Sequence, residues 1–457
     1  MDREKLGSRL GFILVSAGCA IGLGNVWKFP YIAGKGGGGA FVLIYLIFLA
    51  ILALPILLME FAIGRASEKS PVKAYQELER PGSKWHWHGI ASLAGCYLLM
   101  MFYTPVAGWM LYYFYLTSRG TFTSMTPPEV VKVFTGMLGE PWLMAGWMAL
   151  VAVLAVIVCA AGLQKGVERV TKVLMIMLIS VMIFLAIYAG TLPKAAEGLA
   201  FYLVPDFERM IQVGVTGTLA AAMSQAFFTL GLGIGSMLIF GSYFGRDHSL
   251  LGESINITLL DTFVAITSGL IIFPVCFSYG IDQTAGPGLI LIALPMVFGS
   301  MPYGQLFGSA FFLFISFASM STVIAVYENL IGCDMELMGW SRARASLFNL
   351  VAMPLLSMPC ILGFNEWAWP WLKPLGGTIL DLEDFFLSYI LLPIGGLVYI
   401  FFCPSRYGWG WDNFRAEVNA GEGIKLAKWT RGYITFILPV IVLFVFLFGL
   451  YDKFLAG

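Results

Sequence analysis

Two hydrophobic stretches of this chain, residues 16–30 and 225–235, are each interrupted by glycines where a membrane helix would run on unbroken. A helix broken inside a bilayer leaves N–H and C=O groups that hydrocarbon cannot satisfy, so they must face protein, water, ions or a ligand. Paired interruptions in the two halves of a chain are typical of the central site of a secondary transporter. The interrupting glycines are Gly18, Gly22, Gly24, Gly231, Gly233 and Gly235.

The composition predicts an all-α integral membrane protein. Of the 457 residues, 59% are hydrophobic and 12% are charged, and the mean hydropathy is +0.83, which excludes the soluble classes. A membrane-spanning helix needs about 20 mostly apolar residues, and this criterion predicts about 11 transmembrane helices in a single domain, 1–457. The predicted spans are 9–33, 40–63, 90–118, 142–162, 170–192, 216–244, 255–280, 304–332, 345–363, 381–403 and 432–452.

The basic residues predict the orientation. If the N-terminus is cytoplasmic, most of the 27 Lys and Arg residues fall in inner loops, as the positive-inside rule requires. We therefore expect a multi-pass protein of the plasma (inner) membrane with an extracellular C-terminus. Two successive groups of five spans, 9–192 and 216–403, would form repeats of opposite topology, and 432–452 would be an additional helix.

Four polar side chains lie beside the two breaks: Asn25, Gln225, Thr229 and Asp261. An aspartate at the bilayer centre costs roughly 3 kcal/mol on insertion scales, so such residues are functional candidates. The ends of broken helices add N–H groups that attract anions and carbonyls that attract cations. Close helix packing remains an alternative explanation for any single glycine.

The sequence does not favour an enzyme. It contains no HExxH, GxSxG or Walker A motif, and the glycine run at residues 36–39 is not followed by the Lys-Ser/Thr pair of a phosphate loop. The seven cysteines lack CxxC spacing, and the three histidines fall in predicted loops, so no metal-binding cluster is expected. A formal net charge of zero gives no indication of a nucleic-acid partner.

Four motifs occur in order along the chain: GCAIGLGNVWKFPYIAGKGGGGAF, MEFAIGR, SQAFFTLGLGIG and ASMST. In these motifs and their spacing the chain resembles the neurotransmitter:sodium symporter family, from Arg3 to about Cys403. The resemblance implies an inverted five-plus-five helix core with helices one and six broken, sodium-driven uptake of amino acids or amines, and alternating access. Transporters of this family are themselves among the proteins in which paired helix breaks are known to form the transport site. The helix breaks and the motif resemblance are therefore not independent evidence.

The resemblance also implies two sodium sites made of hard oxygen ligands, which suit a hard cation. Together with a carboxylate of the substrate, the first site would use Ala20, Asn25, Thr229 and Asp261. The second would use the carbonyls of Gly18, Ile21 and Ala318 and the hydroxyls of Ser321 and Thr322. The alternative for the two hydroxyls is a hydrogen bond back to their own helix.

Asp261 departs from the family pattern. Many members carry Asn at this position, and chloride-dependent members carry a Ser where this chain has Ala265. We therefore expect chloride-independent transport, with Asp261 providing the negative charge that chloride provides elsewhere.

The resemblance predicts an L-amino acid as substrate, because Gly22 stands where amine-specific relatives carry Asp. The carboxylate would meet sodium, the N–H groups of Leu23 and Gly24, and the Tyr103 hydroxyl. The ammonium would meet the carbonyls near Ala20, Phe228 and Thr229. An apolar side-chain pocket, suited to bulky hydrophobic or aromatic amino acids, would be lined by Leu23, Leu99, Tyr103, Phe228, Gly231, Ile234, Thr322 and Val326.

Charged residues on the two sides of this site are gate candidates. Lys28 could pair with Asp384 outside the site, and Arg3 with Glu336 inside it. The alternative is that these charges snorkel at helix ends. Glu60, in MEFAIGR, is expected to hold the break of the first segment.

Two other functions remain open on the sequence alone. One is a sodium-dependent amino-acid sensor that binds without transporting, and the other is a substrate-gated channel. The expected partners are a small L-amino acid, sodium ions and the lipid bilayer.

Overall fold

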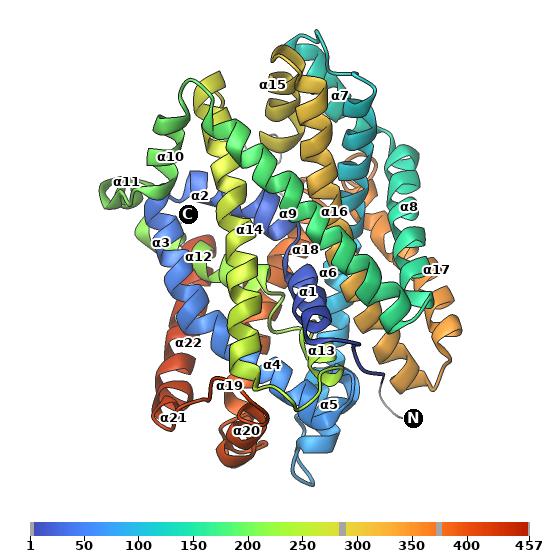
Figure 1. Ribbon diagram of the computed structural model, residues 1–457, viewed down its shortest axis with the longest axis vertical. Coiled ribbons are helices and arrows are strands. Elements are labelled where there is room, and N and C mark those ends of the chain that lie inside the picture. The colour runs from blue at the N-terminus through green and yellow to red at the C-terminus, as the bar shows by residue number, and fades with distance from the viewer. Residues whose placement is uncertain (1–3, 283–288, 372–376, 456–457) are drawn as a thin grey trace.

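The computed structural model describes residues 4–282, 289–371 and 377–455 (Figure 1). Within these ranges every regular element is a helix, and the β-contact found is an isolated bridge between His248 and Glu422. The predicted all-α class is confirmed.

Helices follow one another along the whole chain. The first half contains α1 (Arg9–Ala20), α2 (Phe29–Lys35), α3 (Gly39–Phe48), α4 (Leu54–Ser67), α5 (Pro71–Leu78), α6 (Trp87–Ser118), α7 (Pro127–Gly139), α8 (Pro141–Ala160), α9 (Arg169–Gly190), α10 (Ala195–Leu203) and α11 (Phe207–Val213). The second half contains α12 (Val215–Thr229), α13 (Leu238–Ser242), α14 (Leu250–Tyr279), α15 (Leu294–Ser300), α16 (Gly304–Met338), α17 (Arg342–Leu362), α18 (Ile379–Phe385), α19 (Leu392–Phe402), α20 (Trp411–Val418), α21 (Thr430–Gly432) and α22 (Leu438–Leu455). π-Helical turns occupy Gly24–Lys28, Leu49–Ala53, Leu163–Glu168, Leu289–Ala293, Phe386–Leu391 and Tyr433–Ile437.

Nine helical runs in the described residues are long and apolar enough to cross a membrane. A tenth consists of α1 and the helix from Gly24 to Lys35, which are bent by 53° at the first break. The predicted sixth span is divided into α12 and α13 by the non-helical residues 230–237, so neither piece alone has the length of a span. The broken first and sixth helices are present as expected. The count of eleven spans and the repeat boundaries 9–192 and 216–403 stay predictions.

The most buried span lies at the centre of the bundle. In α16, 78% of the apolar window is buried, against 28% for the span Leu163–Gly190 that contains α9. Figure 1 shows α8 and α17 on one side and α3 and α22 on the other, with α1, α6, α16 and α18 between them. The two breaks therefore lie in the interior of the bundle.

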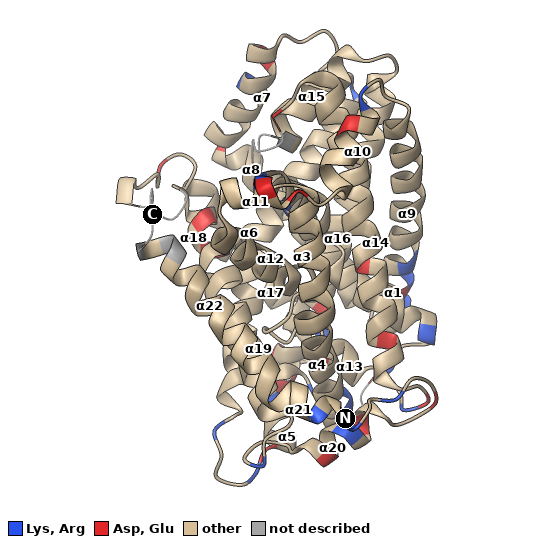
Figure 2. Cartoon of the chain, turned by 90° about the vertical axis from the view of Figure 1, so that its left-hand side faces the viewer, with Lys and Arg blue, Asp and Glu red and all other residues tan. Residues whose placement is uncertain are grey.

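The two ends of the bundle differ in charge. One end carries α7, α10 and α15 and the other α5, α20 and α21 (Figures 1 and 2). We call these the outer and inner ends, following the predicted topology. Figure 2 shows Lys and Arg residues gathered mainly towards the inner end. This is the asymmetry on which the orientation was predicted, and the orientation itself stays a prediction.

Close helix packing explains one glycine of the MEFAIGR motif. A Cβ atom on Gly64 of α4 would lie 1.9 Å from the Leu238 carbonyl oxygen and 2.9 Å from the Ser242 nitrogen. Only a glycine lets the backbones of α4 and α13 approach this closely. The contact fixes α13, the inner half of the second broken span, against α4.

We expect the substitution Gly64→Ala to destabilise the fold by about 1–3 kcal/mol, because the added methyl group overpacks this contact. The measurement is the melting temperature of the purified protein in detergent. Gly146→Ala on α8 is the matched control, since a Cβ there meets no described atom within 4 Å. Equal melting temperatures for the two variants would contradict the packing argument.

Candidate functional site

The first break exposes backbone groups that distant helices satisfy. The chain leaves the helical conformation at Ile21, with φ −74° and ψ 100°. The Leu23 N–H then donates to the Tyr103 hydroxyl at 2.8 Å. The Gly24 carbonyl accepts a 2.8 Å hydrogen bond from the side-chain amide of Gln225. Residues far apart in the sequence therefore hold the first break open.

The second break depends on glycine conformations. Gly231, Gly233 and Gly235 have φ angles of 59°, 94° and 68°, which side chains rarely tolerate. A Cβ on Gly231 would also lie 2.6 Å from the Ser236 hydroxyl oxygen. The positive φ angle and the close Ser236 hydroxyl therefore both require a glycine at position 231, whether or not a ligand also uses the space.

Glu60 holds the second break. Its side chain is fully buried and accepts the Gly233 N–H at 2.6 Å and the Met237 N–H at 3.2 Å. The expectation that Glu60 holds the first break is therefore wrong. The sequence distance from Glu60 to either break carries no information, because α4 reaches the second break through tertiary packing against α13.

Three predicted ligands of the first sodium site lie together. The Asn25 side-chain amide donates to Asp261 Oδ1 at 2.8 Å, and the Thr229 hydroxyl donates to the Asp261 carboxylate at 3.1 and 3.2 Å. Asp261 and Asn25 are fully buried. Ala20, the fourth, ends α1 at the first break. This volume offers a carboxylate, an amide oxygen and a hydroxyl, the hard donors that a small cation needs.

The predicted ligands of the second sodium site also converge. The Ser321 hydroxyl lies 3.3 Å from the Ile21 carbonyl oxygen. The Thr322 hydroxyl lies 3.4 Å from the Gly18 carbonyl and 3.2 Å from that of Ile21. Both hydroxyls also contact the Ala318 carbonyl of their own helix, at 2.9 and 3.4 Å. Each hydroxyl thus contacts carbonyls of the first break and also the Ala318 carbonyl of its own helix, α16.

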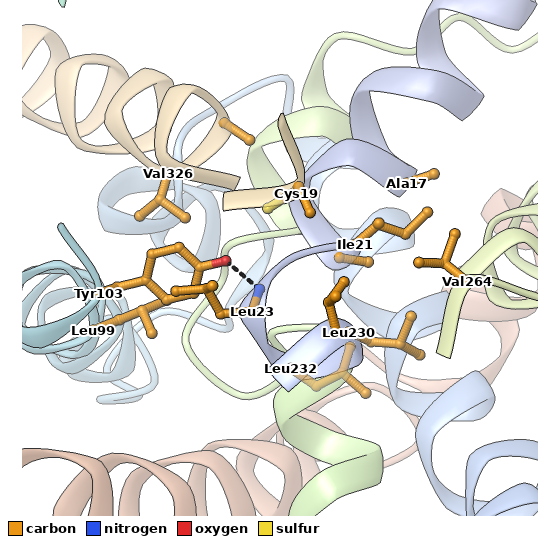
Figure 3. Packing of buried hydrophobic residues seen from close by; sticks show 14 of the residues in the cluster. Ala17, Cys19, Ile21, Leu23, Leu99, Tyr103, Leu230, Leu232, Val264 and Val326 are labelled. Carbon is orange, nitrogen blue, oxygen red and sulfur yellow. Dashed lines mark hydrogen bonds between the residues drawn. The ribbon is translucent and has the colours of Figure 1, made fainter. Parts of the chain in front are cut away.

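The predicted pocket residues of α6 and α16 face the first break. Figure 3 shows Leu99, Tyr103 and Val326 turned towards Leu23. A Cβ on Gly22 would lie 2.1 Å from the Tyr103 hydroxyl oxygen and 2.4 Å from that of Thr322. Any side chain at Gly22 would therefore displace this cluster.

Predicted pocket residues from the second broken span lie on different sides of it. A Cβ on Gly24 would meet the Phe228 ring at 2.9 Å, which places Phe228 against the first break. Ile234 packs on Gly95 of α6, where an added Cβ would lie 2.5 Å from its methyl carbon. The structure thus places Phe228 against the first break and Ile234 against α6.

Lys28 and Asp384, the predicted outer pair, are in contact. The Lys28 ammonium lies 2.7 and 2.9 Å from the two Asp384 carboxylate oxygens, and 4.1 Å from the centre of the Phe228 ring. At the inner end, Glu336 accepts hydrogen bonds from the Ser70 N–H at 3.0 Å and the Ser70 hydroxyl at 2.7 Å. Its predicted partner Arg3 lies outside the described residues, so the inner pair stays a prediction.

Comparison with known proteins identifies the family. The model of the Sodium:neurotransmitter symporter family matches residues 3–127 and 131–454. The chain belongs to this family. It is 33% identical, over 96% of each chain, to a Bacillus subtilis protein named "Uncharacterized sodium-dependent transporter YhdH". It is 29% identical to an uncharacterized sodium-dependent transporter of Haemophilus influenzae, over 98% of this chain and 99% of that protein.

A solved structure extends the comparison to the fold. The crystal structure of MhsT in complex with L-phenylalanine superimposes with a TM-score of 0.88 at 37% identity, covering 98% of this chain and 100% of that one. The family is one of transporters, not enzymes, and sodium is its coupling ion. The recognition of the family and of its fold from the sequence is confirmed.

The structure of this symporter shows two acidic residues that sequence reasoning missed. Glu168, beside α9, accepts hydrogen bonds from the Gly7 N–H at 2.7 Å and the Ser8 hydroxyl at 3.2 Å. Glu253 on α14 pairs with Arg9 at 2.8 Å. Both fasten the start of α1, the inner half of the first broken span. Their signal in the sequence was an acidic residue within or beside an apolar segment, which favours a functional role.

We expect Glu60→Ala to destabilise the symporter, because two buried N–H groups of the second break lose their acceptors. Each unsatisfied group costs about 1–3 kcal/mol. The measurement is the melting temperature of the purified protein. Glu77→Ala, at an exposed position on α5, is the control and should leave it unchanged. A wild-type melting temperature for Glu60→Ala would refute this role.

Proposed function

We propose that this chain is a sodium-coupled symporter of hydrophobic and aromatic L-amino acids that works by alternating access and does not need chloride. The observation that carries the proposal is the convergence of a buried carboxylate, an amide and three hydroxyls on the breaks of two membrane helices. Family membership supports the sodium coupling. The substrate class and the chloride independence rest on the residues of this chain.

Two sodium ions would occupy the two oxygen clusters. The carboxylate of the substrate would complete the first cluster, so sodium and substrate would each strengthen the binding of the other. This mutual dependence is the physical basis of symport, because neither ligand reaches full affinity alone. The first set is Ala20, Asn25, Thr229 and Asp261, and the second is Gly18, Ile21, Ala318, Ser321 and Thr322.

The contact between Tyr103 and the first break supports an amino-acid substrate. The Tyr103 hydroxyl already accepts from the Leu23 N–H, and both groups would turn to the carboxylate of a bound amino acid, with the Gly24 N–H beside them. Its ammonium would meet the carbonyls near Ala20, Phe228 and Thr229. Gly22 offers no acidic side chain, so an amine without a carboxylate would lack its counter-ion.

An apolar pocket would receive the substrate side chain. The likeness to MhsT, solved with L-phenylalanine, supports an aromatic ligand. One methylene in such a pocket is worth only about 1–3 kcal/mol, so we expect overlapping affinities among large hydrophobic amino acids. The lining residues would be Leu23, Leu99, Tyr103, Phe228, Gly231, Ile234, Thr322 and Val326.

Alternating access would use the charged pairs on either side of this pocket. Lys28 and Asp384 would open towards the outer end, and Arg3 and Glu336 towards the inner end, never both at once. The Phe228 ring lies directly under the Lys28 ammonium, so substrate entry would require both to move.

We expect proteoliposomes that contain the protein to accumulate radiolabelled tryptophan, phenylalanine and leucine under an inward sodium gradient, and not with potassium alone. Asp261→Ala should abolish accumulation, because it removes the charged ligand of the first site. Asp412→Ala, at an exposed position on α20, should transport normally.

Other outcomes of this assay would favour the alternative functions. Sodium-dependent binding without accumulation would indicate a sensor, and unitary currents in bilayers would indicate a channel. Uptake restricted to glycine or to charged amino acids would show that the pocket assignment is wrong.

Replacing chloride by gluconate on both sides of the membrane should leave sodium-driven uptake unchanged. The reason is that Asp261 already supplies a fixed negative charge beside the first cation, and Ala265 offers no hydroxyl to hold an anion. The measurement is the initial uptake rate at equal sodium concentration. Loss of uptake in gluconate would rule out the role given to Asp261.

A further inference from the structure

Glu383 and Asp384 are neighbours on α18 that face opposite surroundings. Asp384 has a side chain 27% exposed, pairs with Lys28, and lines, together with Asp381, an outer cavity of about 470 Å³. Glu383, by contrast, is only 5% exposed. α18 therefore has a wet face that carries the gate carboxylate and a dry face that carries a second carboxyl group.

The dry face gives Glu383 little that could stabilise a negative charge. Its Oε2 atom is buried and has no hydrogen-bond partner among the described residues. Its polar neighbour is the buried thiol of Cys360 on α17. Among the side chains that the structure describes, no positive charge lies against the carboxyl group on this side.

The other titratable groups around Glu383 do not change this balance. Asp381 and Asp384 on α18 itself are acidic, and Lys28 is engaged by Asp384. Of the helices that pack against α18, α6 and α17 carry their charged or basic side chains at their inner ends, far along each helix. Those side chains are His88, Arg342 and Arg344. A third helix, α22, contacts Phe385 of α18 through Phe454, and one acid and one base, Asp452 and Lys453, precede Phe454 in the sequence.

A buried carboxylate without a counter-ion or a full set of hydrogen bonds is expensive, whereas a neutral carboxylic acid is not. In the closed arrangement seen here, the surroundings of Glu383 therefore favour the neutral acid. If Glu383 came into contact with water, the same group would ionise at neutral pH.

The geometry of α18 provides a way to bring Glu383 from its buried position into contact with water. α18 is only seven residues long, and it is followed by the π-helical turn Phe386–Leu391 and by Pro393 at the start of α19. A π-helical turn and a proline both interrupt the regular hydrogen-bond ladder of a helix. The segment Ile379–Phe385 can therefore tilt as a unit once the pair between Lys28 and Asp384 separates.

We propose that Glu383 is a proton-binding group coupled to the outer gate. While Lys28 and Asp384 are paired, Glu383 holds a proton on the dry face of α18. When the pair opens and the segment tilts, Glu383 meets outer water and gives its proton to the solvent; closure takes a proton back. This inference rests on the alternating access of the proposed function. Acidic outer solution would then favour the closed form, and alkaline solution the open form.

The test is equilibrium binding of radiolabelled phenylalanine to the purified protein in nanodiscs at saturating sodium. Between about pH 6 and about pH 8, the apparent dissociation constant of the wild type should rise by about threefold or more, because closure then requires proton uptake. Glu383→Gln, which is permanently neutral, should lack this rise. Glu366→Gln, at an exposed position of the outer loop, should behave like the wild type.

Each result decides the proposal. A wild-type pH response in Glu383→Gln would overturn it. Misfolding of Glu383→Gln at acidic pH would also contradict it, because a neutral isostere should fit a site that holds a neutral acid.

A second measurement separates this inference from the proposed function. If no amino acid binds to the wild type, the proposed function fails, but melting temperatures still test Glu383. Because the closed fold holds the extra proton, the wild type should lose stability relative to Glu383→Gln as the pH rises. A constant difference in melting temperature across this pH range would overturn the proposal without any ligand.

Discussion

The backbone groups that two broken membrane helices leave without partners are the constraint on which the rest of this structure depends. In hydrocarbon each such group is costly unless it is satisfied within the protein. Glu60 satisfies two N–H groups of the second break, and Tyr103 and Gln225 satisfy the first. These side chains come from α4, α6 and α12, so the same contacts that satisfy the breaks also fix how the helices pack around them.

The breaks concentrate polar chemistry in an otherwise apolar bundle. Asn25, Thr229 and Asp261 form one hydrogen-bonded group, and Ser321 and Thr322 reach carbonyls that the first break has freed. A buried carboxylate surrounded by neutral donors is stabilised by a cation. The arrangement therefore favours the binding of a cation, because an unpaired charge on Asp261 would be costly at this depth.

Charge is used differently at the gates and in the interior. The Lys28 and Asp384 side chains are 19% and 27% exposed, so water reaches both charges. Separating the pair therefore leaves neither charge without water, and the cost is small. Glu383, one residue away on the dry face of α18, has no such access to water. A single short helix thus carries both a partly hydrated ion pair and a buried carboxyl group, and we propose that the two are coupled.

The sequence determined the membrane class, the two breaks, the polar residues beside them and the family, because hydropathy, glycine placement and local motifs are properties of neighbouring residues. The tertiary structure decided which break Glu60 holds, the ties of Glu168 and Glu253 to the start of α1, and the burial of Glu383 beside a partly exposed Asp384. These depend on which helices approach each other and on which face of a helix meets water. The partners of a side chain across a bundle depend on which helices pack together, and the spacing of residues along the chain does not predict that packing.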